Sequence, residues 1–159
     1  MEHPENAPDT IGIWFRTNGR MRARSFRILV VEDDPLISDL LKNILTRLGQ
    51  KVEVAGNGQE AIRLFALKPY YYEIIVTDHT MPCVDGLELV SHLRKNDFEG
   101  RIIVISGSLT GELINAYKAK RVDKILQKPF VPAELSFTLN VFLTQWSQAG
   151  SQKEHVSRS

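Results

Sequence analysis

The chain has 159 residues, of which 43% are hydrophobic and 25% charged, values typical of one globular domain with a single core. Lys and Arg total 20 against 19 Asp and Glu, and the net charge of +1 gives no bulk attraction to nucleic acid or to an anionic membrane. The single cysteine, Cys83, excludes an internal disulfide framework. No apolar run has the length of a signal-peptide core or a membrane span, so we expect a cytoplasmic protein.

The two ends of the sequence differ from its middle. Residues 1–26 are rich in polar residues, Pro and Gly and show no sustained apolar periodicity, which predicts a flexible polar extension. Met21 heads a plausible shorter start of the protein. Strong patterning begins at Arg27, and we predict one folded domain over residues 27–146. Residues 147–159 are polar and lack apolar spacing, so we expect a frayed tail.

The first half of the patterned region predicts two strands and two helices. Residues 28–31 are continuously apolar, as in a strand buried on both faces of a parallel sheet. Asp34 then caps a helix that Gly49 terminates. Residues 51–55 alternate polar and apolar side chains, as expected of a strand at a sheet edge. Asn57 is the predicted cap of the second helix.

The second half continues the same alternation. Residues 74–76 and 102–105 are apolar and β-branched and predict two more buried strands. Asp85 and Thr110 are the predicted caps of the helices that follow them. Residues 123–128 mix polar and apolar side chains and predict the second edge strand.

The last element fits two patterns, because its apolar residues have both helical and strand-like spacing. Its length and Pro132 near its start favour a helix. Five strand–helix units therefore follow one another, and right-handed crossovers place helices on both faces of the sheet. The sequence predicts a doubly wound α/β fold.

Polar side chains stand where the predicted strands end, the edge at which open parallel sheets carry their functional crevice. The residues concerned are Glu32, Asp33, Asp34, Thr77, Asp78, Thr80, Ser106 and Lys128. Some strand-end acids serve only as helix caps, and Asp34 is predicted to be one. Helix capping does not explain, however, why acids, a hydroxyl and a lysine stand at four strand ends. Crowded carboxylates need a cation, and oxygen ligands favour Mg²⁺ over zinc.

Such a site suits phosphoryl transfer. A carboxylate can act as the nucleophile and form an acyl phosphate, while a divalent metal and Lys128 neutralise the phosphoryl oxygens. The hydroxyl of Ser106 is placed to donate a hydrogen bond to the product.

Four segments, ILVVEDDP, IIVTDHTMPCVDG, IIVISGS and ILQKPF, resemble the successive motifs of bacterial two-component response regulator receiver domains, and the chain looks like a single-domain, chemotaxis-regulator-like member. The resemblance covers residues 27–146. It implies a flavodoxin-like sheet with strand order 2-1-3-4-5 and five helices. It also implies a cis peptide bond before Pro129.

The resemblance assigns roles residue by residue. The implied catalytic set is Asp78 as the phosphoacceptor, with Ser106 and Lys128. The implied Mg²⁺ ligands are Glu32, acting through water, Asp33, Asp78 and the backbone carbonyl of Thr80. The implied switch positions are Ser106 and Ile125, the latter standing where many receivers carry Tyr or Phe.

The function implied is that of a response regulator. It would accept a phosphoryl group from a sensor histidine kinase or a histidine phosphotransfer protein and would change conformation at the face formed by the fourth helix, fifth strand and fifth helix. The downstream protein is unknown, a phosphorylation-dependent homodimer is a further candidate output, and neither direct DNA binding nor a membrane partner is expected. The chain would catalyse only its own phosphorylation and dephosphorylation, so it is not expected to be an enzyme in the ordinary sense.

Two alternatives remain open at this point. One is a phosphatase of the haloacid dehalogenase type, since VTDHT resembles its nucleophile motif, although Thr80 stands where such enzymes usually place a second Asp. The other is a receiver fragment of a hybrid histidine kinase. Beside the site, we expect His79 to have no chemical role and Cys83 to be a small buried filler.

Overall fold

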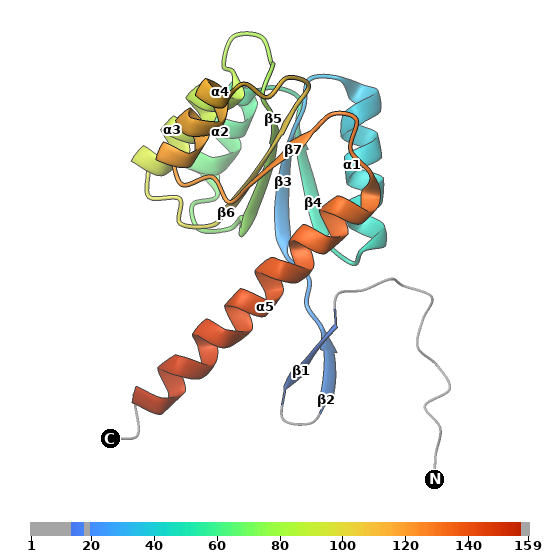
Figure 1. Ribbon diagram of the computed structural model, residues 1–159, viewed down its shortest axis with the longest axis vertical. Helices are drawn as coiled ribbons and strands as arrows, with labels where there is room; N and C mark the ends of the chain where they lie inside the picture. Colours follow the sequence, from blue (N-terminus) through green and yellow to red (C-terminus); the bar gives the residue numbers. More distant parts are fainter. Residues whose placement is uncertain (1–13, 18–19, 157–159) are drawn as a thin grey trace.

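A five-stranded parallel sheet forms the centre of the molecule (Figure 1), and the computed structural model describes residues 14–17 and 20–156 of the chain, with side chains described for residues 24–146. The strands are β3 (Arg27–Val31), β4 (Lys51–Ala55), β5 (Ile74–Asp78), β6 (Arg101–Ser106) and β7 (Lys124–Gln127). Their order in the sheet is β4-β3-β5-β6-β7. Counted along these five strands, this is the order 2-1-3-4-5, which confirms the predicted fold class.

The central strands are buried on both faces, as their unbroken apolar sequences predict. Every residue of β5 is buried, and only the first residue of β3 and of β6 is partly exposed. The two strands with polar residues, β4 and β7, lie at the sheet edges. The alternation of side chains across a strand then divides the core in two: Ile28 faces one set of helices and Leu29 the other.

Five helices cover the sheet, and they are α1 (Pro35–Arg47), α2 (Gly58–Leu67), α3 (Gly86–Lys95), α4 (Gly111–Ala119) and α5 (Pro132–Val156). Helices α1 and α5 pack on one face, through Leu41, Leu45, Leu135 and Leu139. Helices α2, α3 and α4 pack on the other face, and they are seen together on one side of the sheet in Figure 1. The last element, α5, is therefore a helix and not a strand, as its length predicted.

The first four helices begin where the sequence places their caps. The side chains of Asp34, Asn57, Asp85 and Thr110 each accept a hydrogen bond from a backbone N–H of the first turn. Asp85 forms a reciprocal capping box with Glu88, whose side chain accepts from the Asp85 N–H. These caps also fix the direction in which the chain leaves each strand end.

Regular structure extends beyond the predicted domain at both ends. Helix α5 continues past Trp146 to Val156 where a frayed tail was expected, because residues such as Gln, Lys and Glu continue a helix without an apolar stripe. Strands β1 (Trp14–Thr17) and β2 (Arg20–Ala23) form an unpredicted antiparallel pair. Figure 1 shows this pair and the end of α5 projecting beyond the same end of the sheet.

The rest of the predicted extension, residues 1–13 and 18–19, and the last residues, 157–159, lie outside the described residues. The bounds 27–146 stay a prediction. Among the residues that are described, no helix is both long enough and apolar enough to cross a membrane.

Candidate functional site

The carboxyl ends of the strands bring the predicted site residues to one edge of the sheet. Asp78 is the last residue of β5, Glu32 and Asp33 follow β3 directly, and Lys128 follows β7. Carboxylate oxygens of the three acids all lie within 4.8 Å of one another. Asp78 and Glu32 are buried, at 4% and 3% exposure, whereas Asp33 is exposed. The cluster is therefore open to solvent on the Asp33 side.

Both oxygens of the Asp78 carboxylate are held in place. The Lys128 Nζ lies 2.7 Å from Oδ1, and the backbone N–H of Thr80 donates to Oδ2 at 2.8 Å. The Thr77 hydroxyl donates to the Asp78 backbone carbonyl. These contacts fix the orientation of a buried carboxylate whose neighbours also carry negative charge.

Lys128 is shared between two acids, because its Nζ also donates to Glu32 Oε2 at 3.2 Å. Burial alone would lower the pKa of Lys128, but its hydrogen bond to Asp78 and the charges of Asp78 and Glu32 outweigh burial and raise that pKa. Burial raises the pKa of the Glu32 carboxyl, and the charge of Asp78 adds to the rise, while a backbone N–H from Asp34 opposes it. The ammonium group therefore stays charged at neutral pH.

The donor set of the cluster fits a hard divalent cation. Three carboxylates face one ammonium group, so an excess of negative charge remains. All the candidate ligand atoms are oxygens, the type that Mg²⁺ prefers. Thr80 lies in the loop that starts at Asp78, close enough for its N–H to bind the Asp78 carboxylate. The role of its carbonyl as a metal ligand stays a prediction.

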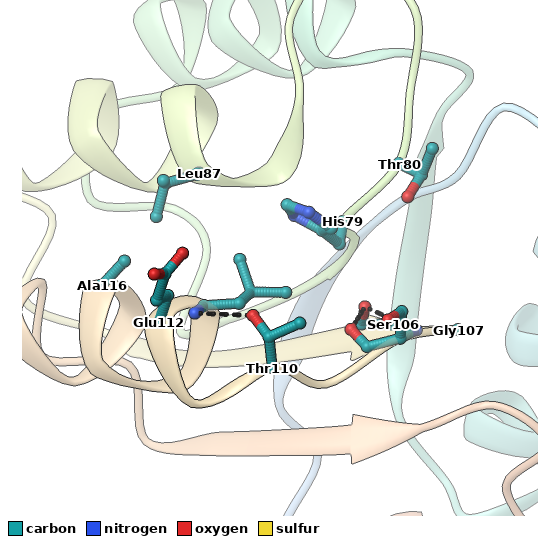
Figure 2. Close-up of a pocket in the computed structure, with 10 residues that line it drawn as sticks. His79, Thr80, Leu87, Ser106, Gly107, Thr110, Glu112 and Ala116 are labelled. Atoms are coloured by element: carbon teal, nitrogen blue, oxygen red, sulfur yellow. Dashed lines mark hydrogen bonds between the residues drawn. The ribbon is translucent and has the colours of Figure 1, made fainter.

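Ser106 lies at the end of β6, buried, and its hydroxyl is engaged within its own loop. The hydroxyl donates to the Ser108 carbonyl at 2.7 Å and accepts from the Ser108 N–H at 3.3 Å. Figure 2 shows Ser106 and Gly107 on this loop, opposite Thr80 and His79. In this arrangement the Ser106 hydroxyl is hydrogen-bonded to the backbone of Ser108.

The remaining predicted positions lie on β7 and just after it. Ile125 is half-buried and packs against the core layer of α2, α3 and α4, as Leu113 and Val122 also do. The Lys128–Pro129 peptide bond is cis, as the family resemblance implied.

Two residues of the loop after Asp78 have surroundings that the sequence did not predict. Cys83 is exposed and has a φ of 69°, so it is not a buried filler. The loop turns outward at that point, and Met81 fills the core instead. His79 has a specific partner that was not predicted: its Nδ1 lies 2.7 Å from the hydroxyl oxygen of Tyr117.

A cavity of about 680 Å³ opens beside the site. It lies between the start of α3, the loop from β6 to α4, and α4 itself, and Figure 2 shows Leu87, Thr110 and Ala116 around it. His79 and Thr80 line the cavity at the end nearest Asp78. The loop that carries Ser106 therefore has open space on one side.

The doubly wound parallel sheet in the order 2-1-3-4-5, with helices on both faces, is the flavodoxin-like fold, and the acidic cluster and Lys128 lie at the carboxyl ends of its strands. Residues 28–140 match the model of the response regulator receiver domain, which is well over half of the chain. The chain belongs to this family, whose members are signalling domains of two-component systems.

Several curated proteins are similar in sequence. The chemotaxis protein CheY of Thermotoga maritima is 37% identical over 119 residues, which cover 72% of this chain and 94% of that protein. A transcription factor of Saccharomyces cerevisiae is 32% identical over 120 residues, 76% of this chain but 19% of that protein. The chain spans between 19% and 53% of the length of this factor and three other relatives.

Solved structures of receivers have the same fold. The receiver domain of the Francisella response regulator 1452 is 31% identical, with a TM-score of 0.68, and 76% of this chain and 98% of that chain are covered. A chain from the complex of CheX, CheY, BeF₃ and Mg²⁺ of Borrelia burgdorferi is 25% identical, with a TM-score of 0.71. The match covers 74% of this chain and 89% of that chain.

Proposed function

We propose that the chain accepts a phosphoryl group on Asp78, in a Mg²⁺-dependent reaction, from the phosphohistidine of a sensor histidine kinase or of a histidine phosphotransfer protein. The observation that carries the proposal is the surroundings of Asp78. In a chain of the receiver family, this buried carboxylate lies 2.7 Å from Lys128 and within 4.8 Å of the acidic pair.

Each residue of the cluster has a distinct part in the proposed reaction. A carboxylate oxygen of Asp78 attacks phosphorus, the new O–P bond forms as the P–N bond of the donor histidine breaks, and the imidazole leaves with the electron pair and takes a proton. Lys128 balances the charge of the phosphoryl oxygens. Asp33, Asp78 and the Thr80 carbonyl would hold Mg²⁺, with Glu32 acting through water, and the metal would supply further positive charge near the phosphoryl oxygens.

The switch would begin at Ser106. A phosphoryl group on Asp78 adds negative charge and acceptor oxygens, which attract the Ser106 hydroxyl away from the Ser108 carbonyl that it now contacts. The loop after β6 moves with Ser106, and this motion biases the arrangement of the α4–β7–α5 face. Ile125 belongs to this face but offers only apolar contact.

The output of this switch stays a prediction in several respects. An unknown downstream protein is the expected partner, a phosphorylation-dependent homodimer is a further candidate, and neither direct DNA binding nor a membrane partner is expected. A cytoplasmic location and a chain that catalyses only its own phosphorylation and dephosphorylation are also predictions. The phosphatase alternative is not favoured, because the chain belongs to the receiver family and carries Thr80 two residues after Asp78.

The test is phosphoryl uptake from acetyl phosphate in the presence of Mg²⁺, followed on a phosphate-affinity gel. The wild type should gain an acid-labile phosphoryl group, and Asp78→Asn should gain none. Asp39→Asn is the matched control, because Asp39 is an exposed carboxylate on α1, and it should behave as the wild type does. A folded wild type without uptake, or equal uptake by Asp78→Asn, would reject the proposal. Chelation of the metal should abolish uptake.

A further inference from the structure

Helix α4 is anchored by one side chain. Tyr117 is its only buried residue, at 0% exposure, while Leu113, Ile114 and Ala116 are half-buried. Since apolar burial supplies most of the stability of a packed helix, the position of this nine-residue helix depends strongly on Tyr117.

The hydroxyl group of Tyr117 reaches the phosphoacceptor strand. It lies 2.7 Å from His79 Nδ1, and the two rings meet edge to face, with centroids 5.7 Å apart. A Cβ atom added at Gly86 would lie 2.9 Å from this hydroxyl and 2.5 Å from the Asp78 carbonyl oxygen. The hydroxyl therefore sits where the end of β5 meets the start of α3, which ties α4 to the residue that follows Asp78.

The chemistry of the pair supports a stable contact. Burial raises the pKa of Tyr117, and the charges of Asp85 and Asp78 add to the rise. The phenol therefore stays protonated and can donate to His79. A hydrogen bond of this kind in a buried place is costly to leave unmade.

The His79–Tyr117 contact occurs in the same structure as the Ser106–Ser108 contact, which is the arrangement proposed for the unphosphorylated domain. Ser106 is bonded to Ser108, and the cavity between α3 and α4 leaves room for α4 and the preceding loop to move. In Figure 2 His79 lies at the edge of this space, across from the loop that carries Ser106 and Thr110. The Tyr117 hydroxyl links this side of the sheet to the residue after Asp78, whereas the side chain of Ile125 on β7 is apolar.

We propose that the His79–Tyr117 hydrogen bond restrains α4 in the arrangement of the unphosphorylated domain, and that Tyr117 is a positioning residue which holds back phosphoryl uptake by Asp78. This inference rests on the proposed function. An interaction made in one of two conformations shifts their equilibrium by its own free energy, so loss of the hydroxyl favours the conformation that accepts the phosphoryl group.

Tyr117→Phe tests the restraint, because it removes the hydroxyl and keeps the ring. The rate of phosphoryl uptake from acetyl phosphate with Mg²⁺ is expected to rise about fivefold, the effect of one typical hydrogen bond. In the unphosphorylated protein, amide hydrogen exchange should become faster in α4, residues 111–119, and stay unchanged in β5.

Tyr72→Phe is the matched control. Tyr72 is also buried, and its hydroxyl donates to Glu53, but it precedes β5 at the end of the sheet away from Asp78. This variant should lose stability without any change in the rate of uptake. A purely structural role for Tyr117 would make the two variants alike.

His79→Phe should reproduce the effect of Tyr117→Phe, and the double variant should show no further increase, because both substitutions break the same bond. Uptake by Tyr117→Phe at the wild-type rate or slower, or α4 exchange equal to that of the wild type, would overturn the restraint. If the wild type takes up no phosphoryl group, the proposed function itself fails, and the exchange measurement alone then decides whether the bond holds α4.

Discussion

At the scale of single residues, Lys128 contacts two carboxylates at the ends of different strands, Asp78 on β5 and Glu32 after β3. Its Nζ lies 2.7 Å from Asp78 and 3.2 Å from Glu32, so the ammonium group offsets part of their mutual repulsion. In the proposed reaction the same group stabilises the incoming phosphoryl oxygens. A single side chain thus serves both the unreacted site and the transfer step.

Replacement of Lys128 by Met should therefore slow phosphoryl uptake by about 10²-fold, which is typical for the loss of one preorganised donor at a site of developing charge. The time course of uptake from acetyl phosphate measures this rate. Lys124→Met is the control, because Lys124 is an exposed lysine on β7, four residues before Lys128, and the rate of this variant should match that of the wild type. Equal rates for both variants would remove Lys128 from the reaction.

The raised pKa of Glu32 predicts a pH dependence of stability. Burial holds this pKa above its ordinary value of 4.5, so the folded protein binds the proton more tightly than the unfolded chain does. The resulting stabilisation is complete below the unfolded pKa and is lost as the pH rises through the folded pKa.

In metal-free buffer, the free energy of unfolding of the wild type relative to Glu32→Gln should therefore fall between acidic and neutral pH. Urea unfolding of both proteins over a pH series measures the difference, in which carboxylates that do not interact with Glu32 cancel. Added Mg²⁺ should restore part of the loss. A difference that is independent of pH, or that grows with pH, would contradict the assigned direction of the shift.

Sequence reasoning found the site residues because strand ends can be located from apolar runs. Glu32, Asp33, Asp78 and Lys128 follow such runs, and parallel strands bring their carboxyl ends to one edge. The contact between His79 and Tyr117 was missed, because these residues are 38 positions apart and meet only when α4 packs on the sheet. Local patterns carry no information about such a pair.

At the scale of elements, the turn that ends α4 carries a conformational cost. Arg121 has a φ of 57°, in the left-handed region that a side chain disfavours. The Arg121 guanidinium pairs with Glu99 at 3.4 Å, but both side chains are exposed, so this pair contributes little.

Arg121→Gly should thus raise the free energy of unfolding by about 1 kcal/mol. Urea unfolding measures the change. Lys120→Gly is the control, because its φ of −97° suits any residue, and that variant should be destabilised. Loss of stability in Arg121→Gly would show that its side-chain contacts outweigh the backbone cost.

The turn after α4 is also held by a side chain of α3, a contact between elements that no sequence pattern reveals. Arg94, on α3, donates hydrogen bonds to the carbonyls of Lys120 and Arg121 at the end of α4, and to the carbonyl of Gly100 before β6. In sequence it looks like an ordinary charged residue of an amphipathic helix. Caps were predictable because they act within four residues, whereas this arginine acts across three elements.

At the scale of the whole molecule, the two ends of the sheet have different tasks. The acidic cluster lies at the carboxyl ends of the strands. At the opposite end, Trp146 of α5 packs on Phe26, with ring centroids 4.9 Å apart, and the guanidinium groups of Arg24 and Arg101 lie over the Trp146 ring. This cluster joins α5 to the chain just before β3.

Trp146→Ala should lower the free energy of unfolding by about 2 kcal/mol through lost burial and ring contacts, while the rate of phosphoryl uptake stays at the wild-type value. Thermal or urea unfolding, together with the uptake assay, checks both statements. Phe137→Ala is the control on the same helix, because Phe137 is 70% exposed, and its stability should change little. A slower uptake in Trp146→Ala would mean that the far end of α5 acts on the site.

The whole-molecule topology was predictable, since five apolar runs separated by capped helices permit few arrangements. The elements that extend beyond the sheet were not predictable. The β1–β2 pair and the last turns of α5 have no apolar stripe long enough to distinguish them from a polar tail.

Exposure of Cys83 has a practical consequence for the homodimer prediction. A protein with one accessible thiol can form a disulfide only with another molecule. In air-oxidised samples this thiol can form a covalent dimer that does not depend on phosphorylation, so sizing experiments need a reductant or Cys83→Ser. The same thiol is a unique attachment point for a fluorescent label, five positions from Asp78. A label there can report the binding of a partner protein in solution without the introduction of a new cysteine.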